Sequence, residues 1–316
     1  MKYRNSPDLP EDKICLTDGG LETVLVFEHG IDLPEFASFT LFKREDGEQL
    51  FRDYLQPYID LAVELKSAFQ LVDCGWRANP AWGQKLGMNQ NQLETVIRDS
   101  IGLMKSLREE NETPDSPMPI IGCIGPRGDG YIPGEMMTAA EATEYHHTQI
   151  GILSDTVADA VTAMTLSYPG EAIGIIEAAR ACHMPVTISF TVETDGRLPN
   201  GEPLAEAIDK CDSETGDYAT GYMINCAHPT HFAETFRGGG DWINRIRGIR
   251  ANASTMSHEE LDQSETLDRG TPQNLASEMA ELLDVAPGIQ IIGGCCGTDF
   301  EHIREIAAAV LEKKRK

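Results

Sequence analysis

Three cysteines in the last third of the sequence have the donor atoms and the neighbouring residues that a metal site requires. Cys295 and Cys296 are adjacent; they follow Ile-Ile-Gly-Gly at 291–294 and precede Gly297. Cys226 ends a second apolar run in the same way. Neighbouring residues of a regular strand point to opposite faces, so two adjacent thiols reach one target only where the backbone bends, which glycines permit. Thiolates that converge from two strand ends predict a zinc site with one open position.

Other interpretations of these cysteines are weaker. A cysteine is often a small buried apolar side chain. We expect that role for the other five: Cys15, Cys74, Cys123, Cys182 and Cys211. A disulfide between adjacent cysteines is strained, and a soft three-thiolate set selects zinc or copper(I) over hard cations. His228 is an alternative fourth ligand, but Pro229 turns the chain away and a fourth protein ligand would close the site.

A second candidate site lies near the N-terminus, where Asp18, Gly19 and Gly20 follow a short apolar run. Backbone amides freed by glycines can receive a carboxylate, while the acid receives an ammonium group. A helix cap and a hydrogen-bonded loop remain equal alternatives for these three residues.

The elements that position these residues alternate between strand and helix. Apolar runs predict eight strands, at residues 14–17, 70–74, 119–124, 160–166, 186–191, 219–225, 246–251 and 289–292. Amphipathic stretches between them, such as 48–69 and 90–108, have helical spacing. Eight such units in about 300 residues suit one closed (β/α)8 barrel better than an open doubly wound sheet. We therefore predict a single α/β domain, a TIM barrel over residues 1–316.

Barrel enzymes place their catalytic residues at the C-terminal ends of the strands. Asp18, Asn225, Cys226, Cys295 and Cys296 all fall at such ends. The eighth strand closes against the first, so the paired cysteines should lie close to Asp18. The glycine-rich loop 125–134 lacks a phosphate-binding pattern, and Gly128-Asp129-Gly130 within it is expected to form a turn.

The composition limits the partners. A net charge of −25 argues against nucleic acid or an anionic membrane surface. No apolar run approaches the roughly 18 residues of a membrane span, and the N-terminus lacks the apolar segment of a signal peptide. Eight cysteines without dense spacing fit a reducing cytoplasm better than a disulfide framework. We expect a cytoplasmic protein with small-molecule partners; the sequence leaves a homo-oligomer open.

Taken together, these motifs resemble the homocysteine S-methyltransferase family. The resemblance runs from about residue 16 to residue 306. It rests on Asp18-Gly19-Gly20, on Asn225-Cys226 and on the Gly-Gly-Cys-Cys-Gly-Thr stretch at 293–298. It implies a (β/α)8 barrel, zinc held by Cys226, Cys295 and Cys296, and homocysteine bound near Asp18 and Gly19. Gly20 and Asn225 belong to the same implied substrate site.

One position departs from the family pattern. The family usually carries a glutamate at the end of the fourth strand that helps to hold the substrate ammonium, and Met164 stands there in this chain. Glu22, Glu171 and Glu193 are the acids available to replace it. The departure leaves another thiol open as the acceptor.

We predict from the sequence a zinc-dependent S-methyltransferase. Zinc would bind and deprotonate the homocysteine thiol, which would attack the methyl group of a sulfonium or ammonium donor and give methionine. The donor types are S-methylmethionine, S-adenosylmethionine and betaine, among which the sequence does not choose. No catalytic residue beyond the zinc-activated thiolate is required. The alternatives are a methyltransferase for a different thiol or selenol, a non-catalytic zinc- or thiol-binding relative, and a zinc hydrolase, which an all-thiolate ligand set disfavours.

Overall fold

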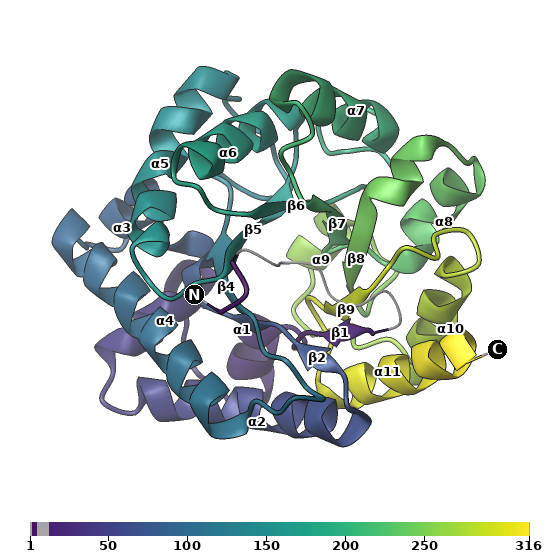
Figure 1. The fold of residues 1–316 in the computed structure, drawn as a ribbon, viewed down its shortest axis with the longest axis horizontal. Helices are drawn as coiled ribbons and strands as arrows, with labels where there is room; N and C mark the ends of the chain where they lie inside the picture. The colour runs from purple at the N-terminus through teal and green to yellow at the C-terminus, as the bar shows by residue number, and fades with distance from the viewer. Residues whose placement is uncertain (1, 5–12, 316) are drawn as a thin grey trace.

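The structure, a computed structural model, describes residues 2–4 and 13–315. A ring of parallel strands forms its centre and helices cover the outside (Figure 1). The outermost residues of the predicted domain, 1 and 316, lie outside the described part. Within that part, no helix combines the length and the apolar character that crossing a membrane requires.

Nine strands lie in the order β2-β1-β9-β8-β7-β6-β5-β4-β3, and each hydrogen-bonded pair is parallel. Their bounds in the described chain are β1 Cys15–Leu16, β2 Ala68–Phe69, β3 Leu71–Val72, β4 Ile120–Ile124, β5 Ala160–Leu166, β6 Val186–Phe190, β7 Gly221–Asn225, β8 Ile246–Ala251 and β9 Ile291–Gly294. The last strand pairs with the first, Cys15 opposite Ile291. The predicted closure of the eighth strand on the first is therefore confirmed.

The ninth strand arises because the second predicted strand is divided at Gln70. On one side, the Ala68 N–H donates to Ile14 O at 3.1 Å; on the other, the Leu71 N–H donates to Pro119 O at 2.9 Å. One short segment therefore pairs with both of its neighbours and closes the ring. The predicted barrel is confirmed, and the count of eight strands was wrong only in treating this segment as one uninterrupted strand that begins at Gln70.

Eleven α-helices of the described chain surround the strands. They are α1 Leu21–Thr23, α2 Gly47–Leu65, α3 Pro80–Lys85, α4 Gln90–Asn111, α5 Ala139–Ser154, α6 Pro169–Ala181, α7 Leu204–Thr215, α8 Pro229–Arg237, α9 His258–Asp262, α10 Pro272–Leu282 and α11 Phe300–Arg315. Capping boxes begin three of them, at Asn89, Thr138 and Ser257. The last of these begins α9, which has only five residues, too few for a periodic apolar pattern in the sequence.

The end of the barrel opposite the cysteines is held by a buried ion pair. The carboxylate of Asp159, which precedes β5, accepts a hydrogen bond from Arg108 of α4 at 2.6 Å and from the Ile120 N–H of β4 at 3.0 Å. Its other oxygen accepts from the Tyr3 N–H at 2.8 Å. Three segments that are far apart in the sequence therefore share one acceptor.

Replacement of this acceptor should destabilise the barrel without touching the cysteines. Asp159→Ala leaves the Arg108 charge buried without its partner, so we expect the free energy of unfolding to fall by about 3–5 kcal/mol. Urea titration measures this change. Asp46→Ala, which breaks an exposed ion pair with Arg44, is the control and should leave the midpoint nearly unchanged. Equal effects of both substitutions would contradict this account of the pair.

Candidate metal centre and substrate pocket

The barrel brings the three cysteines of the predicted zinc site together. Cys226 follows β7, while Cys295 and Cys296 follow β9, and β8 lies between these two strands. The three Sγ atoms all lie within 4.8 Å of one another. One metal ion can therefore contact all three sulfur atoms, and thiolates are the ligands that soft cations prefer.

Two of these sulfur atoms are joined to each other. Cys226 and Cys295 form a disulfide, whereas Cys296 is a free thiol. This pairing was not expected from the sequence, where only a bond between the two adjacent cysteines was considered. The physical reason is that thiols close enough to share a metal ion are also close enough to bond once two protons and two electrons are removed. Both sulfurs become metal ligands only when this bond is reduced, because the thiolate is the ligand.

The backbone at Cys226 is held in an uncommon conformation that aims its side chain at the partner cysteines. Its φ of 54° lies in the left-handed region, which a non-glycine residue adopts only when its surroundings impose it. Its carbonyl oxygen accepts a hydrogen bond from Asn252 Nδ2 at 3.1 Å and lies 2.6 Å from Nε2 of His258. The segment that follows β8, from Asn252 to the first residue of α9, therefore fixes the turn that leaves β7.

Asn225, predicted to bind substrate, lines the pocket but uses most of its amide within the barrel. Its Oδ1 accepts hydrogen bonds from the Thr165 N–H at 2.8 Å and from Ser189 Oγ at 2.6 Å. Its Nδ2 donates to Thr165 Oγ1 at 2.8 Å. The side chain therefore connects the ends of β5, β6 and β7, directly before Cys226.

Cys295 and Cys296 lie in a turn beyond the end of β9, which is how two adjacent thiols approach one point. The Thr298 N–H donates to Cys295 O at 3.1 Å, and Gly297 has a φ of 78°. A Cβ atom at Gly20 would come within 2.4 Å of Cys295 O. Glycine is therefore required at position 20 so that the first and last strand ends can pack together, as the predicted neighbourhood of Asp18 and the cysteine pair demands.

Asp18 has a cationic partner within the chain itself. Its Oδ1 accepts a hydrogen bond from Arg250 Nη2 at 2.7 Å, and its Oδ2 accepts one from Tyr54 at 3.0 Å. The same guanidinium donates to Gly19 O at 3.2 Å and, through Nε, to Gly294 O at 3.0 Å. The Gly20 N–H donates to Thr298 O at 2.9 Å. These contacts occupy groups for which the sequence analysis expected a substrate as partner.

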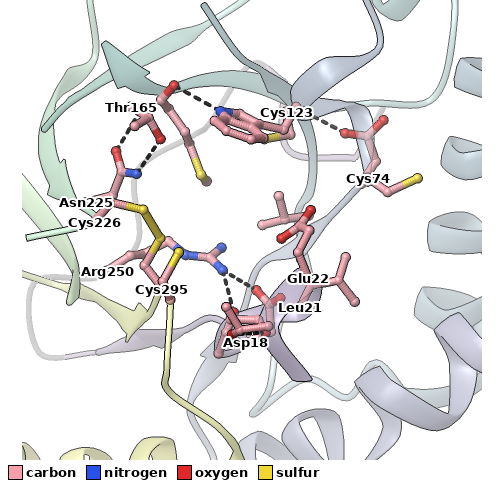
Figure 2. A pocket seen from close by; sticks show the side chains of 18 of the residues that line it. Asp18, Leu21, Glu22, Cys74, Cys123, Thr165, Asn225, Cys226, Arg250 and Cys295 are labelled. Carbon is pink, nitrogen blue, oxygen red and sulfur yellow. Dashed lines mark hydrogen bonds and ion pairs between the residues drawn. A yellow bond between two sulfur atoms is a disulfide. The ribbon is translucent and has the colours of Figure 1, made fainter. Parts of the chain in front are cut away.

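A pocket extends from the sulfur atoms across the mouth of the barrel (Figure 2). Four charged residues line it: Asp18, Glu22, Asp73 and Arg250. Its remaining lining is largely apolar or sulfur-bearing: Leu21, Val72, Cys74, Trp76, Cys123, Tyr131 and Met164 among others. Sequence reasoning did not identify Arg250 or Tyr131 as site residues. The position of Arg250 at the end of a strand was the available signal.

Burial controls the protonation of three groups in this pocket. It raises the pKa of Asp73 to about 7, although N–H groups of Cys123 and Gly75 donate to the carboxylate. Burial also raises the pKa of Glu22 above its ordinary range, against a hydrogen bond from Ser38. Burial, with a contribution from Glu22, raises the pKa of the Cys296 thiol to about 11. Without a cation beside it, the Cys296 thiol therefore keeps its proton at neutral pH.

Other residues considered from the sequence lie away from the sulfur atoms. His228 caps α8, with its ring 2.9 Å from Thr230 Oγ1 and 3.3 Å from Glu278, and burial lowers its pKa to about 4. Glu171 is buried against His146, with 2.9 Å between Nε2 and Oε1. Glu193 pairs with His258 at 3.1 Å. Of the three acids proposed to replace the glutamate at position 164, Glu22 is the one that lines the pocket.

Comparison with known proteins decides the family. The model of homocysteine S-methyltransferase matches residues 15–310. The chain belongs to the homocysteine S-methyltransferase family. The resemblance seen in the motifs is therefore confirmed. Met164 is then a feature of this member within the family.

Relatives in this family differ in length and in sequence. A methionine synthase from Mycobacterium tuberculosis is 28% identical over 235 residues, which cover 71% of this chain and 19% of the relative. This chain therefore spans about a fifth of that protein. The homocysteine S-methyltransferase YbgG of Bacillus subtilis is 25% identical over 320 residues, which cover 93% of this chain and 94% of the relative.

Solved structures of this family share the fold. The homocysteine methyltransferase MmuM of Escherichia coli, in its oxidized form, superposes with a TM-score of 0.73 at 18% identity, covering 98% of this chain and 99% of that chain. The metallated form of the same protein gives a TM-score of 0.71, with the same identity and coverage. At this level of identity the likeness establishes the barrel and its topology.

The connectivity of the cysteines can be read directly by mass spectrometry. When the chain is denatured and alkylated without reductant after oxidation, six of its eight cysteines should react, and one peptide pair should link Cys226 to Cys295. Reduction before alkylation should label all eight. A bond between Cys295 and Cys296 instead would show that the oxidised arrangement described here is wrong.

Asp73 should make the folded protein less stable as pH rises, whereas an acid in a salt bridge has the opposite effect. Its pKa is raised from 3.8 to about 7 on folding, so the folded chain keeps a proton that the unfolded chain releases. The contribution of Asp73 to the free energy of unfolding therefore falls as pH rises from about 4 to about 7, by up to about 4 kcal/mol. Denaturant unfolding of the wild type and Asp73→Asn across this range measures the difference.

Asp73→Asn retains an oxygen that can accept from Cys123 and Gly75, so the folded geometry should persist. The substitution should remove this part of the pH dependence, whereas the exposed control Asp53→Asn should leave the slope intact. Parallel curves for wild type and Asp73→Asn would contradict the raised pKa.

Proposed function

We propose that this protein is a zinc-dependent S-methyltransferase that methylates the thiol of homocysteine and forms methionine. The observation that carries the proposal is the group of three Sγ atoms within 4.8 Å at the edge of a pocket, in a chain of the homocysteine S-methyltransferase family. The relatives named as homocysteine methyltransferases, one of them solved in a metallated form, support both the acceptor and the metal.

Cys226, Cys295 and Cys296 would hold the zinc ion. When bound, zinc would supply the positive charge that keeps the acceptor thiol as a thiolate, which is the nucleophilic form. The donor set fits this metal, because three sulfurs from the protein leave one tetrahedral position for a substrate. His228 is not placed to occupy that position, since its ring contacts Thr230 and Glu278.

The remaining residues position this centre. Asn252 and His258 bind the Cys226 carbonyl and keep its side chain directed at the other two cysteines. Tyr131, from the loop between β4 and α5, hydrogen-bonds Cys296 and extends the pocket wall beside the sulfur atoms. Positioning of two reactants in this way lowers a barrier by as much as about 7–11 kcal/mol.

The methyl donor is proposed to be a cation of the sulfonium or quaternary ammonium class. Two aromatic side chains, Trp76 and Tyr131, line the pocket, and aromatic faces attract cations that have no N–H to donate. The net charge of −25 also favours the approach of a cation. All three cysteines must be reduced to act as ligands, which agrees with the proposed location in the cytoplasm.

Substitution of one cysteine tests the metal and the reaction together. Removal of groups around metal ligands costs about 10–100-fold in affinity, so loss of a ligand in Cys226→Ala should lower zinc affinity by more than about 100-fold and abolish methyl transfer. Zinc content of the reduced protein and methionine formation from homocysteine with each donor class are the measurements.

Cys211→Ala is the matched control, because this cysteine is buried in α7, outside the pocket. It should retain zinc and turnover. Normal turnover by a zinc-free Cys226→Ala variant would refute the zinc mechanism. Zinc binding with methylation of another thiol, but not of homocysteine, would refute the acceptor alone.

A further inference from the structure

Two carboxylates of the pocket, Glu22 and Asp73, have no cation beside them in the described part of the chain. The charged lining of the pocket consists of Asp18, Glu22, Asp73 and Arg250. The Arg250 guanidinium is 2.7 Å from Asp18 and balances that charge. Asp73 receives two backbone N–H groups on Oδ1, at 2.6 and 3.2 Å. Glu22 therefore differs from Asp18 and Asp73 in the groups that contact its carboxylate.

Glu22 is held by a neutral group only. Its Oε1 accepts a hydrogen bond from Ser38 Oγ at 2.7 Å. No Lys, Arg or His nitrogen of residues 2–4 and 13–315 lies within the 4.0 Å of an ion pair with it. In Figure 2 its carboxylate points into the pocket, and Arg250 and Cys295 enter from the other side of the view. A partly buried acid in this setting is stabilised in its charged form by a cation that arrives with a ligand.

The position of Glu22 relative to the sulfur atoms indicates which ligand this is. Glu22 lines the same pocket as Cys295 and Cys296. The wall formed by Val72, Cys123 and Met164 offers no charge to a ligand. A thiol whose sulfur reached the cysteines would therefore find Glu22 as the partly exposed acid without a cation, since Asp73 is buried and held by two backbone N–H groups.

We propose that Glu22 binds the α-ammonium group of the acceptor amino acid, in the place of Asp18, whose charge Arg250 already balances. This inference rests on the proposed function, because it concerns the acceptor of the same site. A carboxylate suits an ammonium group, since it accepts directional N–H hydrogen bonds and charge-assisted bonds are the strong ones. The sulfonium or quaternary ammonium centre of a donor has no N–H to offer it, whereas the acceptor reaches Glu22 with its ammonium group when its sulfur lies at the cysteines.

A pair of thiols that differ only in the ammonium group tests this role. Homocysteine and 4-mercaptobutanoate share their chain, thiol and carboxylate. Their binding to the reduced, zinc-loaded protein is measured by calorimetry without any methyl donor. Glu22→Gln retains the size of the side chain and an oxygen for Ser38, so it should weaken homocysteine binding by about 10–100-fold. The affinity for 4-mercaptobutanoate should change by less than about twofold, because that thiol makes no charge-assisted bond to Glu22.

Two control variants separate this role from a structural one. Glu28→Gln removes an exposed acid six residues further on and should change neither affinity. Ser38→Ala retains the Glu22 carboxylate and removes the hydroxyl that orients it. It should weaken homocysteine binding by a smaller factor and leave 4-mercaptobutanoate unaffected. This second test stands even if Glu22→Gln fails to fold, which thermal unfolding and zinc content report.

The outcomes that overturn the inference are distinct from those that overturn the proposed function. Equal loss of both thiols in Glu22→Gln, or unchanged homocysteine binding, rejects the role of Glu22 while the methyltransferase assignment stands. If the zinc-loaded wild type binds neither thiol, the proposed function is wrong and the inference falls with it.

Discussion

The convergence of two strand ends on one point is the constraint on which the site depends. Cys226 leaves β7 through a left-handed backbone conformation, and Cys295 and Cys296 leave β9 through a turn. The strained conformation at Cys226 is compensated by hydrogen bonds to its carbonyl from the segment after β8. Because β8 separates the two strands, the same element provides both the spacing between the sulfurs and the groups that hold them.

Close sulfur atoms give this site two chemical states. In the structure two of the three form a disulfide and the third is a thiol whose pKa is about 11, so no thiolate is favoured at neutral pH. In the reduced state, a bound cation would compensate the charge that burial otherwise disfavours. Oxidation would therefore compete with the proposed metal for the same sulfurs. The oxidized and metallated forms of MmuM both share this fold.

The pocket distributes its charges differently from the expectation based on the family. Asp18 is paired with Arg250, the apolar Met164 stands at the end of β5, and Glu22 lines the cavity. A buried charge requires a partner. In the proposed function, the ammonium group of the acceptor therefore needs an acid other than Asp18, whose charge Arg250 balances.

The sequence alone was sufficient to predict the barrel, the meeting of the three cysteines and the family, because these follow from local properties. Apolar runs and helical periodicity depend on neighbours within a few residues, and the Gly-Gly-Cys-Cys-Gly stretch is specific by itself. The sequence did not indicate the division of the second strand at Gln70, because the hydrogen bonds that define β2 and β3 come from different neighbouring strands.

The tertiary structure alone decided which charged and sulfur-bearing groups meet. Arg250 and Asp18 are 232 positions apart, and Cys226 and Cys295 are 69 apart. The Arg250–Asp18 pair forms because the ring of strands closes and sets the last strand beside the first. The Cys226–Cys295 pair forms because β7 and β9 lie on either side of β8. No pattern along the chain records this, because hydrophobic spacing specifies the face on which a residue lies and not the distant residue that it contacts there. The ion pair of Asp18 was therefore decided by barrel closure.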